Sequence, residues 1–244
     1  MVERIEHLQA EKPFEASFVT VRFLHFSGIQ AKWKAFTEMG RARFEFWKAE
    51  GLLFSKHLGS GAGKGFSILP DLSTYAWLGV WNSSEHAKQF FSNDTRWLKF
   101  RSLAADCSGW DGIPIRSHGT WNGQQPFVSA SDLGGWTGRV AVLTRASIRR
   151  SKALRFWMNV PGSSKGIENQ PGLIFAKGVG ELPLVEQATL SLWDNVQSVQ
   201  AFAYKGQAHA PMVRKTRETG WYSEEMFVRM AVMDEFGFDT PTLK

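Results

Sequence analysis

Cysteine is almost absent from this chain, because its 244 residues include a single one, Cys107. A lone cysteine excludes an internal disulfide and any metal site built from several thiolates. Long hydrophobic runs are missing too: the longest largely apolar run, residues 75–81, is far shorter than the roughly 20 residues that span a bilayer. Residues 1–12 lack the apolar core of a signal peptide. We therefore expect a cytoplasmic protein.

Several catalytic motifs are also missing. The sequence has no His-x-x-Glu-His spacing, which is typical of zinc hydrolases. The glycine-rich segment 59–65 suggests a phosphate loop, but Lys64 is followed by Gly65 rather than by a Ser or Thr that opens a helix. Residues 178–180 are too short for a dinucleotide-binding fingerprint. Cys107 has no base nearby in sequence. These absences disfavour nucleotide enzymes, zinc hydrolases and thiol enzymes.

Basic residues exceed acidic ones, giving a net charge of +6 and a pI of about 9.5. They are dispersed along the chain, with no basic run or zinc-finger spacing that would support a nucleic-acid partner. An anionic membrane surface is equally compatible with this charge, as is a solvated surface with no partner. We expect no nucleic acid, and we leave peripheral membrane contact open.

Aromatic residues are abundant, with 11 Trp and 19 Phe, and hydrophobic residues make up 43% of the chain. This composition predicts a globular protein, and such rings fill cores or line pockets for large apolar ligands. Alternating and amphipathic stretches predict eight strands and four helices. We expect strands at residues 18–26, 52–58, 74–81, 113–119, 139–145, 173–179, 186–193 and 226–233, and helices at 30–47, 84–105, 151–160 and 198–218, the last with a break at residues 206–211.

The two halves of the chain look like copies of one another. Val80-Trp81-Asn82 before a helix bearing Phe90 matches Leu192-Trp193-Asp194 before a helix bearing Phe202, at an offset of 112 residues. A repeat of this length is typical of a domain duplication, and each half has the element order of a ferredoxin-like unit. We predict an α+β fold in which the two halves pack face to face as a barrel-like sandwich.

Four segments follow from this interpretation. They are an N-terminal extension (1–17), a first ferredoxin-like half (18–119), a Gly-, Ser- and Gln-rich connector (120–138) and a second ferredoxin-like half (139–244). Exposed sheet edges often pair between chains, so we also expect a homo-oligomer.

His209 is the best candidate for a ligand. Phe202, Gly206 and Val213 lie seven before, three before and four after it, which places all four on one face of a helix. An inward-facing imidazole needs a partner, which is a side chain, a carbonyl or a metal. Gly206 leaves room for a flat group beside it, an arrangement that often holds a haem iron. His57 is a weaker candidate that could line a pocket.

Three cations fall within or at the ends of predicted inner strands: Lys177, Arg145 and Lys56. They either extend outward from strand ends or stand beside a bound oxygen or carboxylate, where a low dielectric strengthens their field.

A set of segments in a fixed order spans nearly the whole chain, from about residue 18 to 232. The segments are 56–61 with 65–66, 141–146, 156–157 with 160–161, 177–183, 187–194, 202–204, His209 and 220–225. As a set they resemble the spheroidene monooxygenase family of carotenoid ketolases. The family is also similar in build to dimeric α+β barrel haem proteins such as the chlorite dismutase group, whose proximal histidine lies on a helix of the C-terminal half.

The resemblance implies a haem b monooxygenase that oxidises one carbon of an apolar substrate twice, so that a gem-diol loses water to give a ketone. It makes His209 the iron ligand, with Glu224 or Glu225 as a partner for its other ring nitrogen. Lys177 or Arg145 would be the catalytic cation on the distal side. The remaining cofactor- or channel-lining residues would be Phe202, Gly206, Val213, Trp157, Phe175 and Trp193. The electron donor is not indicated.

Three alternatives stay open. One is another haem enzyme, such as a peroxidase, dehydratase or lyase acting on a small substrate. The second is a haem-binding protein without catalysis. The third is a cofactor-free barrel monooxygenase or binding module.

Overall fold

A computed structural model describes residues 16–42, 47–63, 69–159, 167, 170–182, 184–205 and 219–238 of the chain. The first half runs β1 (Phe18–His25), α1 (Ile29–Ala42), β2 (Leu52–Gly61), β3 (Pro70–Trp81), α2 (Ser84–Asn93), α3 (Thr95–Ser102) and β4 (Asp106–Gly119). The second half runs β5 (Val140–Ile148), a 3-10 turn (Arg150–Lys152), α4 (Ala153–Asn159), β6 (Leu173–Leu182), β7 (Glu186–Trp193), α6 (Val196–Lys205) and β8 (Tyr222–Phe236). The fold is therefore mixed α and β, as the sequence predicts.

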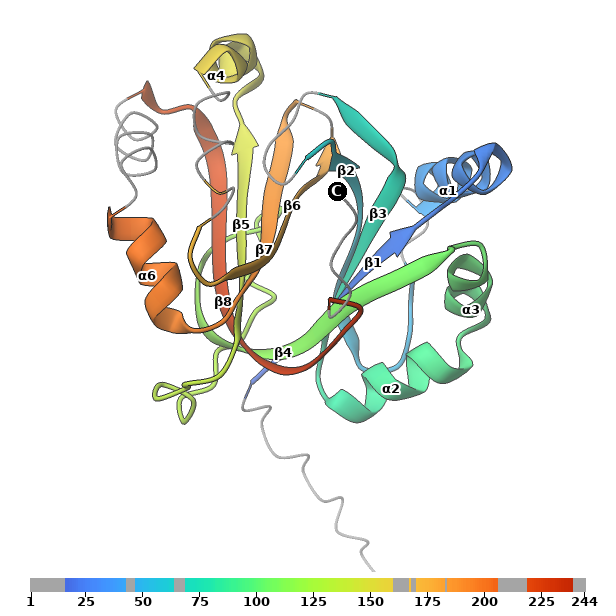
Figure 1. Cartoon of the computed structure of the whole chain (residues 1–244), viewed down its shortest axis with the longest axis horizontal. Coiled ribbons are helices and arrows are strands. Elements are labelled where there is room, and N and C mark those ends of the chain that lie inside the picture. The colour runs from blue at the N-terminus through green and yellow to red at the C-terminus, as the bar shows by residue number, and fades with distance from the viewer. Residues whose placement is uncertain are drawn as a thin grey trace, which may run out of the picture.

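The eight strands form one closed antiparallel barrel in the order β1-β3-β2-β6-β7-β5-β8-β4 (Figure 1). Within the first half the order is β4-β1-β3-β2, and the second half repeats it as β8-β5-β7-β6. The two junctions differ in length. The β4–β8 junction runs from Gly109 opposite Phe236 to Gly119 opposite Met226, whereas β2–β6 pairs only Gly59 with Gly180 and Ser60 with Val179. The short junction leaves two neighbouring strands apart over much of their length.

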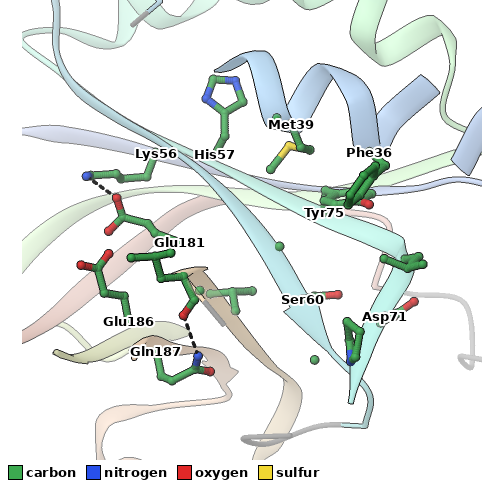
Figure 2. Close-up of a pocket in the computed structure, with 18 of the residues that line it drawn as sticks. Phe36, Met39, Lys56, His57, Ser60, Asp71, Tyr75, Glu181, Glu186 and Gln187 are labelled. Carbon is green, nitrogen blue, oxygen red and sulfur yellow. Dashed lines mark hydrogen bonds and ion pairs between the residues drawn. The ribbon is translucent and has the colours of Figure 1, made fainter. Parts of the chain in front are cut away.

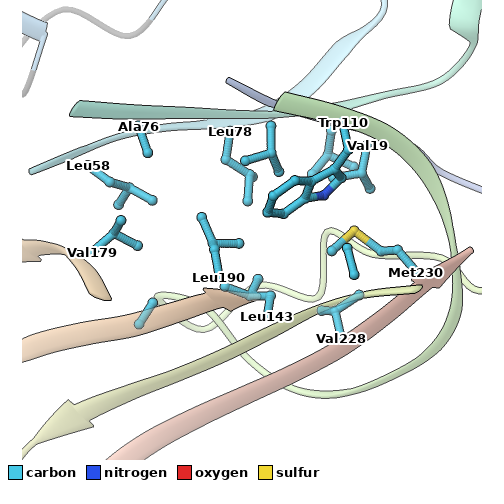
Figure 3. Packing of buried hydrophobic residues seen from close by; sticks show 14 of the residues in the cluster. Val19, Leu58, Ala76, Leu78, Trp110, Leu143, Val179, Leu190, Val228 and Met230 are labelled. Atoms are coloured by element: carbon cyan, nitrogen blue, oxygen red, sulfur yellow. The ribbon is translucent and has the colours of Figure 1, made fainter. Parts of the chain in front are cut away.

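The interior of the barrel is packed with side chains from alternate positions of the strands. Figure 3 shows Leu58, Leu78, Leu190 and Val228 pointing toward one another across this interior. All four are fully buried. Full burial of a side chain of this size contributes about 1.5–3 kcal/mol, so this cluster is a main source of stability.

The helices cover the outside of the barrel, with α1, α2 and α3 beside the first half and α4 and α6 beside the second (Figure 1). Under α2 and α3 the outer face of the first-half sheet is filled by large rings. Trp77 and Trp81 of β3 are fully buried there, and Phe90 of α2 stacks on Trp77 with ring centroids 5.2 Å apart. This outer cluster fixes the first-half helices on their sheet.

The helix predicted at residues 84–105 is two helices, α2 and α3, and Asp94 is the reason for the break. Its carboxylate accepts hydrogen bonds from the backbone N–H groups of Arg96 and Trp97 at 2.9 and 3.1 Å, which caps α3. Its own N–H donates to the carbonyl of Phe90 and ends α2. An aspartate at an N-cap stabilises the start of a helix by about 1 kcal/mol.

The segment between β4 and β5 closes one end of the barrel. Trp121 and Phe127 are buried and belong to the barrel core, although the predicted connector is rich in Gly, Ser and Gln. The Trp121 indole donates to Glu181 at 2.6 Å. The segment is thus part of the packed domain rather than a loose link. Among the described residues, no helix is long and apolar enough to cross a membrane.

Candidate functional site

A cavity of about 650 Å³ lies where β2 and β6 diverge, beside α1 (Figure 2). A volume of this size is typical of sites for small-molecule ligands. Its apolar wall comes from α1 and from the strands and turns on either side of the junction. This wall includes Phe36, Met39, Leu72, Val179, Leu182 and Leu184.

Glycines and two buried polar atoms mark the sheet side of this cavity. Gly59 and Gly180 face each other across the β2–β6 junction and present no side chain. His57 precedes Gly59 by two residues on β2, and Tyr75 lies opposite Gly59 on β3. His57 Nε2 and Tyr75 Oη are buried, and neither has a hydrogen-bond partner in the part of the chain that the structure describes. Such atoms are costly unless something pairs with them.

The His57 imidazole and the Tyr75 phenol are both uncharged at neutral pH. Burial lowers the pKa of His57 from 6.5 to about 4, because a charged imidazolium loses hydration in this wall. Burial also raises the pKa of Tyr75, and the nearby Asp71 carboxylate adds to that shift. The wall therefore presents an uncharged imidazole and a protonated phenol.

The lysines near the cavity are paired with carboxylates. Lys56 donates to Glu181 at 2.5 Å, and Lys177 donates to Asp71 at 2.8 Å. Burial acts to raise the pKa of Asp71, but hydrogen bonds from Lys177 and Ser73 outweigh it and hold that pKa well below its usual range. Each pair thus keeps opposite charges in contact.

Arg145 lies at the centre of a second charged cluster, at the end of the barrel closed by the β4–β5 segment. Its guanidinium is 1% exposed and pairs with the carboxylate of Glu224. It also donates to the side-chain oxygen of Asn122 at 3.2 Å and lies 5.3 Å from the Trp121 ring centre. The cluster anchors the segment to β5 and β8.

The Glu224 carboxylate accepts hydrogen bonds from both sides. Burial acts to raise its pKa, but the Gly123 N–H, the Thr120 hydroxyl and Arg145 lower it to about 2. One oxygen accepts from Thr120 and Gly123, each at 2.7 Å, and the other accepts from Asn122 at 3.1 Å and from Arg145. Glu224 is therefore held by Arg145 and by the segment between β4 and β5.

The outer face of the second-half sheet carries small side chains. Thr144 of β5 pairs with Thr189 of β7, which pairs with Gly178 of β6. We call these three residues the threonine row. Thr144 is exposed although its neighbours on the same face, Val142 and Ala146, are buried. The middle of this face is therefore less covered than its surroundings.

In the first half of the chain, a tryptophan occupies the position that corresponds to Thr189. Trp81 and Trp193 are 112 residues apart, and the same offset places Trp77 opposite Thr189 in the repeat. Trp77 pairs with Arg22 of β1, as Thr189 pairs with Thr144 of β5. A buried indole in one half thus corresponds to a threonine in the other.

Two of the predicted cofactor-lining residues lie together beside the threonine row. Trp193 is buried on the outer face of β7, and its ring packs on Phe202 of α6 with centroids 5.4 Å apart. His209, Gly206 and Val213, the core of the predicted iron site, lie outside the described residues.

The other predicted lining residues are separated from that pair. Trp157 of α4 is buried against Phe156 and donates to the Leu184 carbonyl at 2.8 Å. Phe175 packs on Phe23 within the barrel core, with centroids 4.7 Å apart. Neither shares the outer cluster of Trp193.

The two predicted catalytic cations lie on the barrel side of the sheet. Arg145 follows Leu143, a core residue, at the two-residue spacing of one strand face. Lys177 likewise lies between Phe175 and Val179, which pack in the same core. Each is paired with a carboxylate, Arg145 with Glu224 and Lys177 with Asp71.

Sequence reasoning missed Tyr75 and the threonine row. The 112-residue repeat could have revealed the threonine row, because it aligns Trp77 with the much smaller Thr189. Tyr75 carried no signal of its own, because its unpaired hydroxyl depends on how β3 faces α1. Among the described residues, no group of three or more His, Cys, Asp or Glu side chains could hold a metal ion.

Comparison with known proteins identifies the family, although no family model matches the chain. A spheroidene monooxygenase of Rhodobacter capsulatus is 33% identical over 185 residues, covering 75% of this chain and 77% of that protein. The chain belongs to the spheroidene monooxygenase family. A second member, from Rubrivivax gelatinosus, is 35% identical over 179 residues, covering 73% of this chain and 68% of its own length. The resemblance seen in the sequence is thereby confirmed, and the chain is related to monooxygenases, which are oxidoreductases.

Solved structures show the same fold at low sequence identity. The crystal structure of an aldoxime dehydratase in complex with butyraldoxime has a TM-score of 0.59 and 9% identity, covering 92% of this chain and 82% of that one. A second aldoxime dehydratase structure has a TM-score of 0.58 and 8% identity. These likenesses concern the fold alone.

Proposed function

We propose that the protein is a haem-dependent monooxygenase that oxidises an apolar, carotenoid-like substrate to a ketone. Family membership carries the proposal, since three relatives named spheroidene monooxygenase match at 31–35% identity. The aromatic content of the chain and the apolar wall of its cavity are compatible with a large apolar substrate.

The outer face of the second-half sheet fits a flat cofactor better than the outer face of the first-half sheet does. A macrocycle needs a flat surface of small side chains, and the threonine row offers one where Trp77 blocks the first half. Trp193 and Phe202 add apolar rings beside it. A haem bound there would supply the oxygen activation that side chains alone do not provide. We keep His209 as its proposed ligand.

The chain's own residues would set access and polarity at this site. The Thr144 and Thr189 hydroxyls are short donors that add no charge to an apolar surface. Lys177 and Arg145 would position the sheet from the barrel side, through Asp71 and Glu224, rather than touch the substrate. Trp157 and Phe175 would support the surrounding packing.

We further propose that the two halves are ferredoxin-like repeats derived by duplication. The repeated strand order, with α2 beginning at Ser84 and α6 at Val196, supports this origin. Association into a homo-oligomer and peripheral membrane contact remain predictions.

The proposal is tested in cells that accumulate spheroidene and express the full chain. We expect extracted pigment in which one CH₂ group has become C=O, detected by mass spectrometry. The His209→Ala chain, expressed to the same level, should leave the pigment unchanged. Unaltered pigment in cells that contain soluble, haem-loaded wild-type protein would contradict the carotenoid assignment.

A further inference from the structure

We infer that the mouth of the cavity beside the β2–β6 junction docks on the surface of an anionic lipid bilayer. The docking surface is an apolar rim made of Trp33, Phe36, Leu72 and Leu184, with basic side chains of α1 and of the turn before α4 beside it. The inference goes beyond the proposed function and needs no cofactor.

The large apolar side chains of the rim are exposed. Phe36 of α1, Leu72 of β3 and Leu184 of the β6–β7 turn all line the cavity, yet they are 51%, 52% and 42% exposed. Trp33 is 67% exposed and stacks on Phe36 with ring centroids 5.9 Å apart. Figure 2 shows Phe36 on the side of the cavity away from Glu181. Three separate elements thus contribute to one apolar surface around the opening.

Helix α1 is apolar on two faces. On the inner face, Ala35 is fully buried and Met39 packs against the same core. Ile29, Trp33 and Phe36 follow the spacing of a second face, and Ile29 is 88% exposed. The outward face of a helix that covers a sheet is normally polar. The second apolar face of α1 is therefore available for contact with a partner.

Leu184 has a backbone conformation that leucine rarely adopts. Its φ is 69°, in the left-handed region that glycine and asparagine tolerate better. An exposed leucine gains little burial within the chain to offset this strain, so folding alone does not explain a leucine at this turn. A contact of its side chain with an apolar partner does.

The α1 side of the rim is basic. The helix carries Lys32, Lys34 and Arg41 against a single acid, Glu38. Lys34 and Arg41 are exposed, and Glu38 lies 3.6 Å from Arg41. The apolar face of α1 therefore has unneutralised positive charge beside it.

The α4 side of the rim is basic as well. Helix α4 packs on the β6–β7 turn, because the Trp157 indole donates to the Leu184 carbonyl at 2.8 Å. Arg149 and Arg150, just before α4, are exposed, and Leu154 of α4 is 77% exposed. This side thus repeats the combination of cations with an exposed apolar side chain.

The acidic residues of the cavity wall offset little of this charge. Glu181 pairs with Lys56 at 2.5 Å, and Asp71 pairs with Lys177 at 2.8 Å. Glu186 adds one further acid to the described wall. The exposed charge around the mouth is therefore mainly positive.

A bilayer surface matches this combination better than a second copy of the chain does. Tryptophan and phenylalanine rings with cations beside them are typical of helices that lie in the membrane interface. Anionic headgroups attract the cations, while the acyl boundary accepts the rings. A second copy of the same surface would bring the cations against their own counterparts, which opposes a symmetric dimer.

The inference is tested by sedimentation of the purified full chain with lipid vesicles. One set contains phosphatidylcholine alone, and the other contains equal parts of phosphatidylcholine and phosphatidylglycerol. We expect at least about tenfold tighter binding to the anionic vesicles, and weaker binding as the salt concentration rises. Lys34→Gln and Arg150→Gln should each weaken binding to the anionic vesicles about fivefold.

Variants of the apolar residues then locate the surface. Trp33→Gln, at a side chain exposed in the folded chain, should weaken vesicle binding about tenfold. Leu53→Gln is the matched control, because Leu53 is 54% exposed but lies at the other end of the β2–β3 pair from Leu72. It should bind vesicles as the wild type does.

Leu184→Asn separates docking from folding. We expect about fivefold weaker vesicle binding, while the midpoint of urea unfolding stays the same or rises, because asparagine tolerates a positive φ. A variant that is less stable than the wild type and binds vesicles equally well would show that Leu184 serves folding.

The inference is overturned if neither vesicle binds, if both bind equally well, or if Trp33→Gln and Leu53→Gln have the same affinity. A dimer that Trp33→Gln dissociates, in a chain that ignores vesicles, would assign the surface to a second copy. These outcomes are separate from haem uptake and ketone formation. A chain that docks but takes up no haem refutes the cofactor alone, and one that forms the ketone but ignores vesicles refutes the docking alone.

Discussion

At the scale of single residues, the buried Arg145 depends on its carboxylate partner. A guanidinium with 1% exposure has lost nearly all its hydration, and Glu224 replaces it. The same carboxylate accepts backbone N–H groups of Asn122 and Gly123, so one acidic residue also fixes the segment that closes the barrel.

Glu224→Gln should destabilise the fold by about 2–3 kcal/mol at pH 7, because it removes the nearer of the two carboxylates beside the buried Arg145 charge and leaves Glu181 at 3.9 Å. The pKa of Glu224 falls from 4.5 to about 2 on folding. Its contribution is therefore complete above about pH 4.5 and is lost as the pH falls toward 2. Urea unfolding of both proteins at pH 7 and pH 3 should show a smaller difference at pH 3.

The neighbouring, exposed Glu225 provides the control for this experiment. Glu225→Gln should change the free energy of unfolding by less than about 0.5 kcal/mol at either pH. An equal loss for Glu224→Gln at pH 7 and pH 3 would contradict the assigned role of its charge.

The sequence identified Arg145 and Lys177 as notable but could not show what they contact. Their partners, Glu224 and Asp71, lie 79 and 106 residues away in the chain. The alternation of side chains along a strand predicts which face of the sheet Arg145 and Lys177 occupy. It does not predict which distant carboxylate contacts them there. The role of such residues depends on strand register, which emerges only in the folded barrel.

At the scale of elements, the short β2–β6 junction is where the two halves meet beside the cavity. Its two glycines differ in their surroundings. A Cβ on Gly180 would lie 2.4 Å from the Glu186 carbonyl oxygen, whereas a Cβ on Gly59 would meet its nearest atom at 3.8 Å. Gly180 is thus needed for close packing of β6 on β7, and Gly59 is not.

Gly180→Ala should destabilise the protein by about 1–3 kcal/mol, because the backbone must move to accept the methyl group. Gly59→Ala should leave stability unchanged or raise it by up to about 1 kcal/mol. The midpoint of urea unfolding measures both. If the two variants have equal stability, the tight contact at Gly180 is not present in solution.

Much of the element order could be predicted from the sequence, because alternating apolar residues and the repeat of Trp81 at Trp193 are local signals. The break at Asp94 was missed, since a single capping residue interrupts an otherwise helical pattern. The cavity was indicated only through His57, which was expected to line a pocket. Its position could not be predicted, because it arises where β2 and β6 diverge, and these strands are far apart in the chain.

At the scale of the whole molecule, the two halves share a strand order but differ in what covers their outer faces. Trp77 under Phe90 closes the first-half face, whereas the threonine row leaves Thr144 exposed on the second. In a barrel whose two halves share a strand order, one half can serve for packing while the other binds ligands. The family resemblance indicated the second half, and the residues that distinguish it are visible only when the two sheets are compared.

Haem binding tests this account most directly, by titrating the purified chain with haemin and recording its ultraviolet–visible spectrum. We expect a sharp Soret band that saturates at one haem per chain. His209→Ala should lose stoichiometric binding while it remains folded. Thr189→Trp, which rebuilds the first-half arrangement, should weaken binding at least about tenfold, whereas Thr189→Val, of similar size to threonine, should bind normally. A wild-type spectrum that does not differ from free haemin would contradict the account.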